Sequence, residues 1–279
     1  MSFMSGTLVL AATPLGNPGD LSPRARAALE SSDIIFAEDT KRAALACSRW
    51  GVAARRFVSC HDHNERAKLE ELLGFLRDGC TCTLISDAGM PVLADPGYVL
   101  VAACRKENIP VTVIPGPCAP VTALAGSGIP PQPFVFFGFL PRGYSDVEKT
   151  IAPFASAPCT LVFFERKDRI AETLKTLRPL LGSRQVCLAR ELTKTHEEYI
   201  FFNTDEIPPL DDLLGELTVI VGPPDSTRRT EREEVEKIIA EEMPGGGKPR
   251  EVARRVAARV CGWTSSDIYA LVPGRGNRP

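Results

Sequence analysis

Carboxylates follow two apolar segments of this chain, at the point where each segment ends. The run DIIFA is followed by Glu38, Asp39 and Thr40, and the run CTLIS is followed by Asp87. A carboxylate after a buried strand can transfer a proton during catalysis or accept hydrogen bonds from a ligand. It can equally cap the next helix or close an Asx turn. The residues alone leave both interpretations open.

A third cluster of charged residues follows another apolar run, in the segment ARELTKTHEE. Arg190, Glu191 and Lys194 lie within five positions of one another. A lysine or carboxylate there can orient or deprotonate a hydroxyl group. The competing interpretation is a solvated turn that is held by its own salt bridges.

Two further motifs carry reactive residue types. His61 and His63 flank an aspartate, but no additional histidine or CxxC pair completes a ligand set, so we expect no metal. The competing interpretation is a polar loop in which Asn64 caps the next helix. Cys118, in the turn PGPCA, is a weak candidate nucleophile. The nine cysteines are scattered, which is typical of a reducing, cytoplasmic compartment.

The first part of the chain, residues 1–118, alternates short apolar runs with helical patterns, which predicts a mostly parallel sheet of about five strands with helices on both faces. The loops at 13–20, 38–40 and 86–97 should meet at one edge of this sheet, together with 115–119. The predicted strands span 7–12, 33–37, 57–59, 82–86 and 111–114, and the predicted helices span 22–31, 40–50, 66–78 and 98–107.

Residues 119–224 differ in composition and contain five further strand-like runs rich in aromatic and β-branched residues. Helical patterns at 145–155 and 168–181 interrupt them. The run EYIFF follows QVCLAR closely, which suggests an antiparallel pair. We therefore predict a second α/β domain with a mixed sheet.

Residues 225–279 form the third predicted part, a small basic helical domain behind a linker-like stretch at 223–229. Helices are expected at 230–242 and 249–260, with a last short helix that begins at Thr264 or Ser265. The net charge of the whole chain is -2, so any contact with nucleic acid must be local. Such a local basic patch exists here, in Lys248, Arg250, Arg254, Arg255, Arg259, Arg275 and Arg278.

Several common site motifs are missing from the sequence. There is no G-x-G-x-x-G after the first strand, no phosphate-binding P-loop and no G-x-S-x-G elbow. No apolar run approaches the roughly 20 residues that a membrane-spanning helix needs, so we expect no membrane contact.

Six motifs together resemble those of the tetrapyrrole methylase superfamily. They are AATPLGNPGDLSPRA, FAEDTKR, HDHNE, SDAGMPVLADPGY, PGPCA and ARELTKTHEE, in this order. More narrowly, they look like the bacterial cytidine 2′-O-methyltransferases that act on small-subunit (16S) ribosomal RNA. The resemblance covers about residues 6 to 272.

The resemblance implies two α/β domains with S-adenosyl-L-methionine held between them. It implies a 2′-hydroxyl acceptor, ribosomal RNA or the small ribosomal subunit as partner, and a homodimer. Candidate catalytic residues are Glu38, Asp39, Glu191 and Lys194. Cofactor contacts are expected from Asp87, Gly89, Met90, Pro91, Cys118, Ala119, Phe164 or Glu165, Ala189 and Leu217. Substrate contacts are expected from Thr13, Asn17, Thr40, Arg190, Arg250, Arg254 and Arg255.

The sequence departs from that family at two positions. Met90 stands where the family usually has threonine, and Asp168 stands where a histidine often precedes the arginine. Two alternatives remain open. One is a methylase of the same superfamily that acts on a tetrapyrrole, corrin or protein, and the other is a non-catalytic relative that binds the ribosome.

Overall fold

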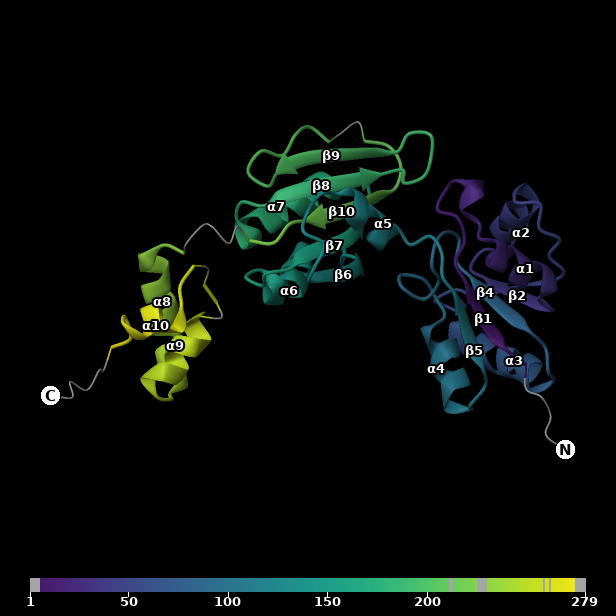
Figure 1. Cartoon of the computed structure of the whole chain (residues 1–279), viewed down its shortest axis with the longest axis horizontal. Helices are drawn as coiled ribbons and strands as arrows, with labels where there is room; N and C mark the ends of the chain where they lie inside the picture. Colours follow the sequence, from purple (N-terminus) through teal and green to yellow (C-terminus); the bar gives the residue numbers. More distant parts are fainter. Residues whose placement is uncertain (1–5, 211–212, 225–229, 258, 261, 274–279) are drawn as a thin grey trace. The chain divides into compact units, whose positions relative to one another are not determined.

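The computed structural model describes residues 6–210, 213–224, 230–257, 259–260 and 262–273 of the chain (Figure 1). These residues fall into two compact units. The first contains Met1–Gly126 with the later segments Ala189–Tyr199 and Gly215–Thr218. The second contains Ser127–Leu188, Ile200–Leu214 and Val219–Pro279. Two short pieces of the second half of the chain thus belong to the first unit.

The first unit is built on a five-stranded sheet with the order β3-β2-β4-β1-β5. All four neighbouring pairs run parallel, and Leu8 lies opposite both Cys82 and Val111. This confirms the predicted parallel sheet. The strands are β1 (Leu8–Ala11), β2 (Ile34–Ala37), β3 (Phe57–Ser59), β4 (Cys82–Ile85) and β5 (Val111–Ile114).

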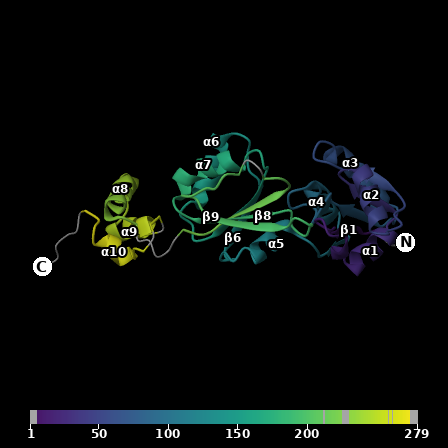
Figure 2. The ribbon, with the colours of Figure 1, turned by 90° about the horizontal axis from the view of Figure 1, so that it is seen from above.

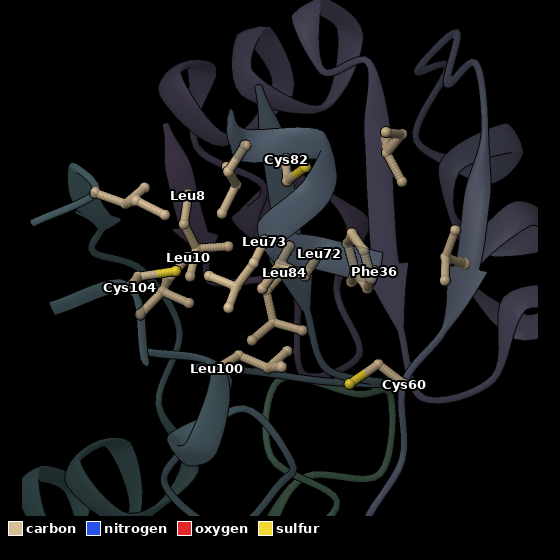
Figure 3. Packing of buried hydrophobic residues seen from close by; sticks show 14 residues of the cluster. Leu8, Leu10, Phe36, Cys60, Leu72, Leu73, Cys82, Leu84, Leu100 and Cys104 are labelled. Carbon is tan, nitrogen blue, oxygen red and sulfur yellow. The ribbon is translucent and has the colours of Figure 1, made fainter. Parts of the chain in front are cut away.

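Helices cover both faces of this sheet, as predicted. One face packs Phe36 and Leu84 against α3 and α4, and Figure 3 shows this cluster with Leu72, Leu73 and Leu100. The opposite face packs against α1 and α2 in a separate cluster. The helices are α1 (Pro23–Ser31), α2 (Thr40–Arg49), α3 (Glu65–Arg77) and α4 (Tyr98–Lys106), with η1 (Pro18–Asp20) before α1 and α5 (Ala119–Gly126) after β5.

Local signals set the starts of two helices. The Ser22 hydroxyl accepts a hydrogen bond from the Ala25 N–H, and Pro23 occupies the first position of α1. Asp39 caps α2 in the same way. The sequence did not predict α5, because its residues, APVTALAG, are apolar without a helical periodicity.

The second sheet has the order β6-β7-β10-β8-β9. Strands β6 and β7 are parallel, whereas β8 and β9 run in opposite directions in Figure 1. The short connection between β8 and β9 requires this, because a parallel crossover needs a dozen or more residues. The mixed sheet is therefore confirmed. Its strands are β6 (Phe134–Phe139), β7 (Thr160–Glu165), β8 (Gln185–Arg190), β9 (Glu198–Asn203) and β10 (Leu217–Val221), with α6 (Tyr144–Ile151), η2 (Ala152–Phe154) and α7 (Ile170–Leu181).

The last helices form a small cluster of their own, which Figure 2 shows as one group. They are α8 (Arg232–Glu242), η3 (Met243–Gly245), α9 (Pro249–Ala257) and α10 (Ser265–Tyr269). Val235, Val256 and Ile268 are fully buried in its apolar core. The linker residues 225–229, Arg275 and Arg278 lie outside the described residues. Over the described part of the chain, no helix is long and apolar enough to cross a membrane.

Candidate active site

Three loops meet beyond the carboxyl ends of β1, β4 and β5. Thr13 and Gly89 exchange two backbone hydrogen bonds, of 2.9 and 3.0 Å, which join the loop after β1 to the loop after β4. Gly89 has a φ of +81°, and an added Cβ would lie 3.0 Å from Leu15 Cδ2 and 3.5 Å from the Pro117 carbonyl oxygen. Only glycine fits this backbone conformation without strain. The predicted meeting of these loops is confirmed.

Hydroxyl groups shape the turn that follows β4. The Ser86 hydroxyl donates to the carbonyl oxygens of Ala88 and Gly89, at 3.1 and 3.3 Å. Thr13 is fully buried, and its hydroxyl donates to the Ser86 carbonyl at 3.5 Å. The visible role of Thr13 is to hold the turn, and the substrate contact expected of it stays a prediction.

The motif HDHNE supports this loop from α3. One Glu65 carboxylate oxygen accepts hydrogen bonds from the N–H groups of Gly97 and Val99, at 2.8 and 3.0 Å, at the start of α4. A carboxylate there also complements the helix dipole. This role could not be predicted from the sequence, because the partners are 32 and 34 residues from Glu65 and no local pattern reveals the pairing.

Asn64 does not cap α3 through its side chain, so that expectation was wrong. Its amide oxygen accepts from the His61 N–H at 2.8 Å, and its amide nitrogen donates to the Ser59 carbonyl at 3.2 Å. The amide is used to close the loop between β3 and α3, so it cannot also reach the N–H groups of the helix. Among the described residues, no group of three or more His, Cys, Asp or Glu could hold a metal ion.

The carboxylates after β2 and β4 lie close together and are bridged by one arginine. Arg42 donates to Asp87 at 3.0 Å and lies 3.7 Å from Asp39. One Asp39 oxygen accepts from the N–H groups of Arg42 and Lys41, at 3.1 and 2.9 Å. The hydrogen bond from the Arg42 N–H is the largest of the effects that lower the pKa of Asp39. Asp39 is therefore the cap of α2.

Glu38 is different, because its carboxylate accepts no hydrogen bond from any residue in the described ranges. Burial raises its pKa, and the nearby carboxylates of Asp87 and Asp62 raise it further. Burial also raises the pKa of Asp95 to about 6, with added repulsion from Glu38 and Asp87. Like charges at close range disfavour ionisation. His61 and Arg42 attract the charged form and offset part of this rise. Glu38 is thus a carboxylate of raised pKa with no hydrogen-bond partner among the described residues.

The charged residues of the segment after β8 neutralise one another. Lys194 Nζ lies 2.9 Å from both Glu191 Oε1 and Glu216 Oε2, and Glu191 Oε1 also accepts from the Glu216 N–H at 3.0 Å. Although burial alone would raise the pKa of Glu191, the Glu216 N–H and Lys194 lower it. Burial alone would lower the pKa of Lys194, but Glu216 and Glu191 raise it. Both groups are therefore held in their charged forms.

This turn lies against the first loop of the first unit. The Asn17 N–H donates to the Thr193 hydroxyl at 3.1 Å, although the two residues are 176 positions apart. The Lys194 side chain occupies the space beside Gly16. Arg190 forms an ion pair of 2.9 Å with Glu198. The structure thus brings together two motifs, TPLGN and RELTK, that the sequence separates.

The other predicted contact residues lie at or near ends of elements. Phe164 is on β7 of the second unit, where its ring packs 5.1 Å from Phe136 and 5.3 Å from Phe139. Glu165, beside it, is buried and accepts from the Thr173 hydroxyl at 2.7 Å. In the first unit, the predicted residues are Met90 and Pro91 in the loop after β4, Cys118 and Ala119 at the start of α5, Thr40 in α2, and the buried Ala189 and Leu217.

Comparison with solved structures identifies the fold. The methyltransferase CobJ superposes with a TM-score of 0.62 at 20% identity, covering 81% of this chain and 98% of that one. A uroporphyrin-III C-methyltransferase from Thermus thermophilus, solved in complex with S-adenosylhomocysteine, gives a TM-score of 0.54 at 19% identity and covers 78% of this chain and 97% of that one. At these identities the likeness establishes the architecture.

Comparison of sequences identifies relatives along almost the whole chain. Proteins named ribosomal RNA small subunit methyltransferase I from Micromonospora olivasterospora and Mycobacterium tuberculosis are each 38% identical and cover 96% of this chain, and 87% and 95% of their own lengths. The protein of that name from Thermotoga maritima is 37% identical over 78% of this chain and 98% of its own length. The model of the tetrapyrrole (corrin/porphyrin) methylases matches residues 7–208, and this chain belongs to that family of methyltransferases.

Proposed function

We propose that this protein transfers a methyl group from S-adenosylmethionine to the 2′-hydroxyl of a cytidine in small-subunit (16S) ribosomal RNA. Family membership supports methyl transfer, and the names of relatives that cover 96% of this chain support ribosomal RNA as the substrate. The observation that carries the proposal for the chemistry is Glu38, a carboxylate of raised pKa without a hydrogen-bond partner among the described residues.

The loop after β4 is suited to hold the methyl donor. When bound there, S-adenosylmethionine would supply an electrophilic methyl group, which would pass to the acceptor oxygen while S-adenosylhomocysteine leaves with the electrons of the broken C–S bond. The positive φ of Gly89 brings the backbone of three loops together, and Asp87 offers a carboxylate oxygen beside them. We assign donor binding to Asp87, Gly89, Met90, Pro91, Cys118, Ala119, Phe164, Ala189 and Leu217.

Glu38 is proposed as the general base that removes the proton of the acceptor hydroxyl. The other three candidates are already engaged, Asp39 as a helix cap and Glu191 with Lys194 as an ion pair. A base works best when its pKa approaches the working pH, and the pKa of Glu38 is raised toward it. Asp39, Glu191 and Lys194 would then position the loops around the acceptor.

Asn17 lies in the loop after β1, Thr40 begins α2 and Arg190 ends β8, and we propose that all three contact the RNA. Arg190 has its charge shared with the exposed Glu198, so a phosphate can compete for it. We further propose that the acceptor is reached on the small ribosomal subunit and that the protein works as a homodimer in the cytoplasm.

A second candidate is methylation of a corrin or porphyrin. The solved structure of a uroporphyrin-III C-methyltransferase from Thermus thermophilus, with a TM-score of 0.54, favours it. The helices after residue 208 speak against it, because they lie beyond the segment that the tetrapyrrole methylase model matches. We therefore rank ribosomal RNA first.

The test is to incubate the protein and radiolabelled S-adenosylmethionine with small subunits from cells that lack this protein. In parallel, it is offered naked 16S RNA and uroporphyrinogen. We expect label in RNA, released as 2′-O-methylcytidine after complete digestion to nucleosides. Label on a base, or only on the porphyrinogen, would refute the proposal.

A matched pair of variants tests the base. Glu38→Gln removes the free carboxylate, and Asp39→Asn changes the neighbouring cap. We expect the first to abolish most RNA methylation while S-adenosylmethionine still binds in calorimetry, and the second to retain more activity. Arg42→Gln should move the acid limb of the pH–rate profile to higher pH, because Arg42 lowers the pKa of Glu38.

A further inference from the structure

The helix α9 of the C-terminal cluster has one apolar face and several basic residues off it. Val252, Ala253 and Val256 are buried against α8 and α10. The described members of the predicted basic patch lie on α9 or beside it, and they are Lys248, Arg250, Arg254, Arg255 and Arg259. The structure divides these basic residues into two groups.

The first group is used inside the cluster. Arg255 donates to a Glu242 carboxylate oxygen at 2.8 Å and to the carbonyl oxygens of Glu242 and Gly246 at 3.0 Å each. Arg259 forms ion pairs of 2.8 Å with both Glu241 and Glu242. Hydrogen bonds from Arg255 and Arg259 lower the pKa of Glu242. These two arginines join α9 and the turn after it to α8.

The second group points to solvent. Lys248, Arg250 and Arg254 are exposed, and Arg250 and Arg254 lie one helical turn apart on the same face. Within the described ranges, the side chains of Lys248 and Arg254 form no hydrogen bond or ion pair. The Arg250 guanidinium lies 6.0 Å from the ring centroid of Tyr269, which is partly exposed on α10.

We propose that Lys248, Arg250, Arg254 and Tyr269 form an RNA-docking surface, in which the cations bind phosphates and the tyrosine ring stacks on a base. The inference rests on the proposed function and adds the surface that holds the substrate. Guanidinium groups match phosphate geometry with paired hydrogen bonds, and aromatic rings beside cations are platforms for unpaired bases. Arg255 and Arg259 do not belong to this surface, because their charges are already neutralised.

The surface serves affinity and not the chemical step. It lies outside residues 7–208, which match the methylase family model. The relative from Thermotoga maritima aligns over 98% of its own length while covering 78% of this chain, so a protein of that name does without part of what is present here. Loss of the surface should therefore raise KM for RNA and leave kcat nearly unchanged.

The experiment compares two double variants of the full-length chain. Arg250→Gln with Arg254→Gln removes two surface cations from α9. The matched control, Arg232→Gln with Lys237→Gln, removes two exposed cations from α8. Binding to a naked 16S RNA transcript is measured by fluorescence anisotropy between 50 and 300 mM salt, roughly the range in which phosphate contacts are visible.

We expect the α9 pair to bind on the order of tenfold more weakly at physiological salt, and the slope of log K against log salt to flatten by about 1.5, as for two lost phosphate contacts. The control should match the wild type in both. Tyr269→Ala should weaken binding without changing the slope, and Tyr269→Phe should restore it. Affinity for S-adenosylmethionine and Tm should be unchanged in the α9 pair.

The proposed docking surface would be refuted if the two double variants weakened RNA binding equally, or if the α9 pair did not weaken it at all. An Arg255→Gln variant that keeps its Tm and loses as much affinity as the α9 pair would also refute it. These measurements of RNA binding do not depend on methyl transfer, so they test the docking surface even if the wild-type protein methylates no RNA. A lack of RNA methylation would refute the proposed function but not the docking surface.

Discussion

Two charged clusters follow buried strands in the first unit, and they treat their carboxylates in opposite ways. After β2 and β4, the carboxylates of Glu38, Asp87 and Asp95 repel one another, and the pKa of Glu38 and of Asp95 is raised. After β8, Glu191 is clamped by Lys194 and by a backbone N–H, and its pKa is lowered.

The difference shows how similar residue types acquire different tasks. A carboxylate that is paired with an ammonium and a backbone N–H is stabilised as the anion, so it holds structure and resists protonation. A carboxylate that is partly buried among others is a stronger base and retains free lone pairs. The first arrangement fixes a turn, and the second is suited to proton transfer.

The largest effect should come from exchanging the two carboxylates for amides. Glu38→Gln is expected to lower kcat for RNA methylation by roughly 10²- to 10⁴-fold, the usual contribution of a general base. Glu191→Gln should lower kcat by much less and should mainly reduce stability. Single-turnover assays with saturating S-adenosylmethionine separate the two. If Glu191→Gln proves the more damaging in kcat, the roles of the clusters are reversed.

The next effect concerns the packing around the ion pairs of Lys194 with Glu191 and Glu216. Gly215 has a φ of +93°, and an added Cβ would collide with the Glu191 side chain. Gly215→Ala should lower the free energy of unfolding by roughly 2–4 kcal/mol, from backbone strain and displacement of the clamp. Gly128→Ala is the control, since its φ is +65° but no atom lies within 4 Å of the added Cβ. Urea denaturation should show a smaller decrease in the free energy of unfolding for Gly128→Ala. Equal decreases in the two variants would mean that displacing the Glu191 side chain does not affect stability.

A smaller effect is expected from Glu65, which binds the end of the loop that contains Asp87 and Asp95. Glu65→Ala removes the acceptor for two N–H groups at the start of α4 and should cost about 1–2 kcal/mol. It should also raise the Kd for S-adenosylmethionine, because the loop from Asp87 leads directly into α4. Glu70→Ala, on the exposed side of the same helix, serves as the control in both measurements. If the Kd for S-adenosylmethionine is unchanged in Glu65→Ala, the hydrogen bonds at the start of α4 do not influence donor binding.

The smallest effect is a pH dependence from Asp95. Burial, with repulsion from neighbouring carboxylates, raises its pKa from the ordinary 3.8 to about 6 in the folded protein, so the folded state binds the proton more tightly. Its contribution to the free energy of unfolding therefore falls as pH rises from about 4 to about 6, and is constant above that. Asp95→Asn should be less sensitive than the wild type when urea midpoints at pH 5 and pH 7 are compared. If the urea midpoints of the two proteins change equally with pH, the pKa of Asp95 is not raised on folding.

Much of the fold could be predicted because its signals are local. The apolar runs that became the first five strands, the serine cap before Pro23 and the cap at Asp39 all act over a few residues. The antiparallel placement of β8 and β9 follows from the short connection between them. Helix α5 escaped prediction, because its apolar sequence has no periodicity to distinguish it from a buried strand.

The sequence by itself determined the strands and helices of two α/β sheets and the motifs that identify a methylase, because each depends on neighbouring residues. Only the tertiary structure decided which charges pair. Glu65 binds the N–H of Gly97, 32 residues away, at the start of α4. Lys194 pairs with Glu216, 22 residues away, and Thr193 bonds to Asn17, 176 residues away. Whether a carboxylate is a clamp or a base depends on such distant partners, since its proton affinity is set by the charges and N–H groups that folding places beside it.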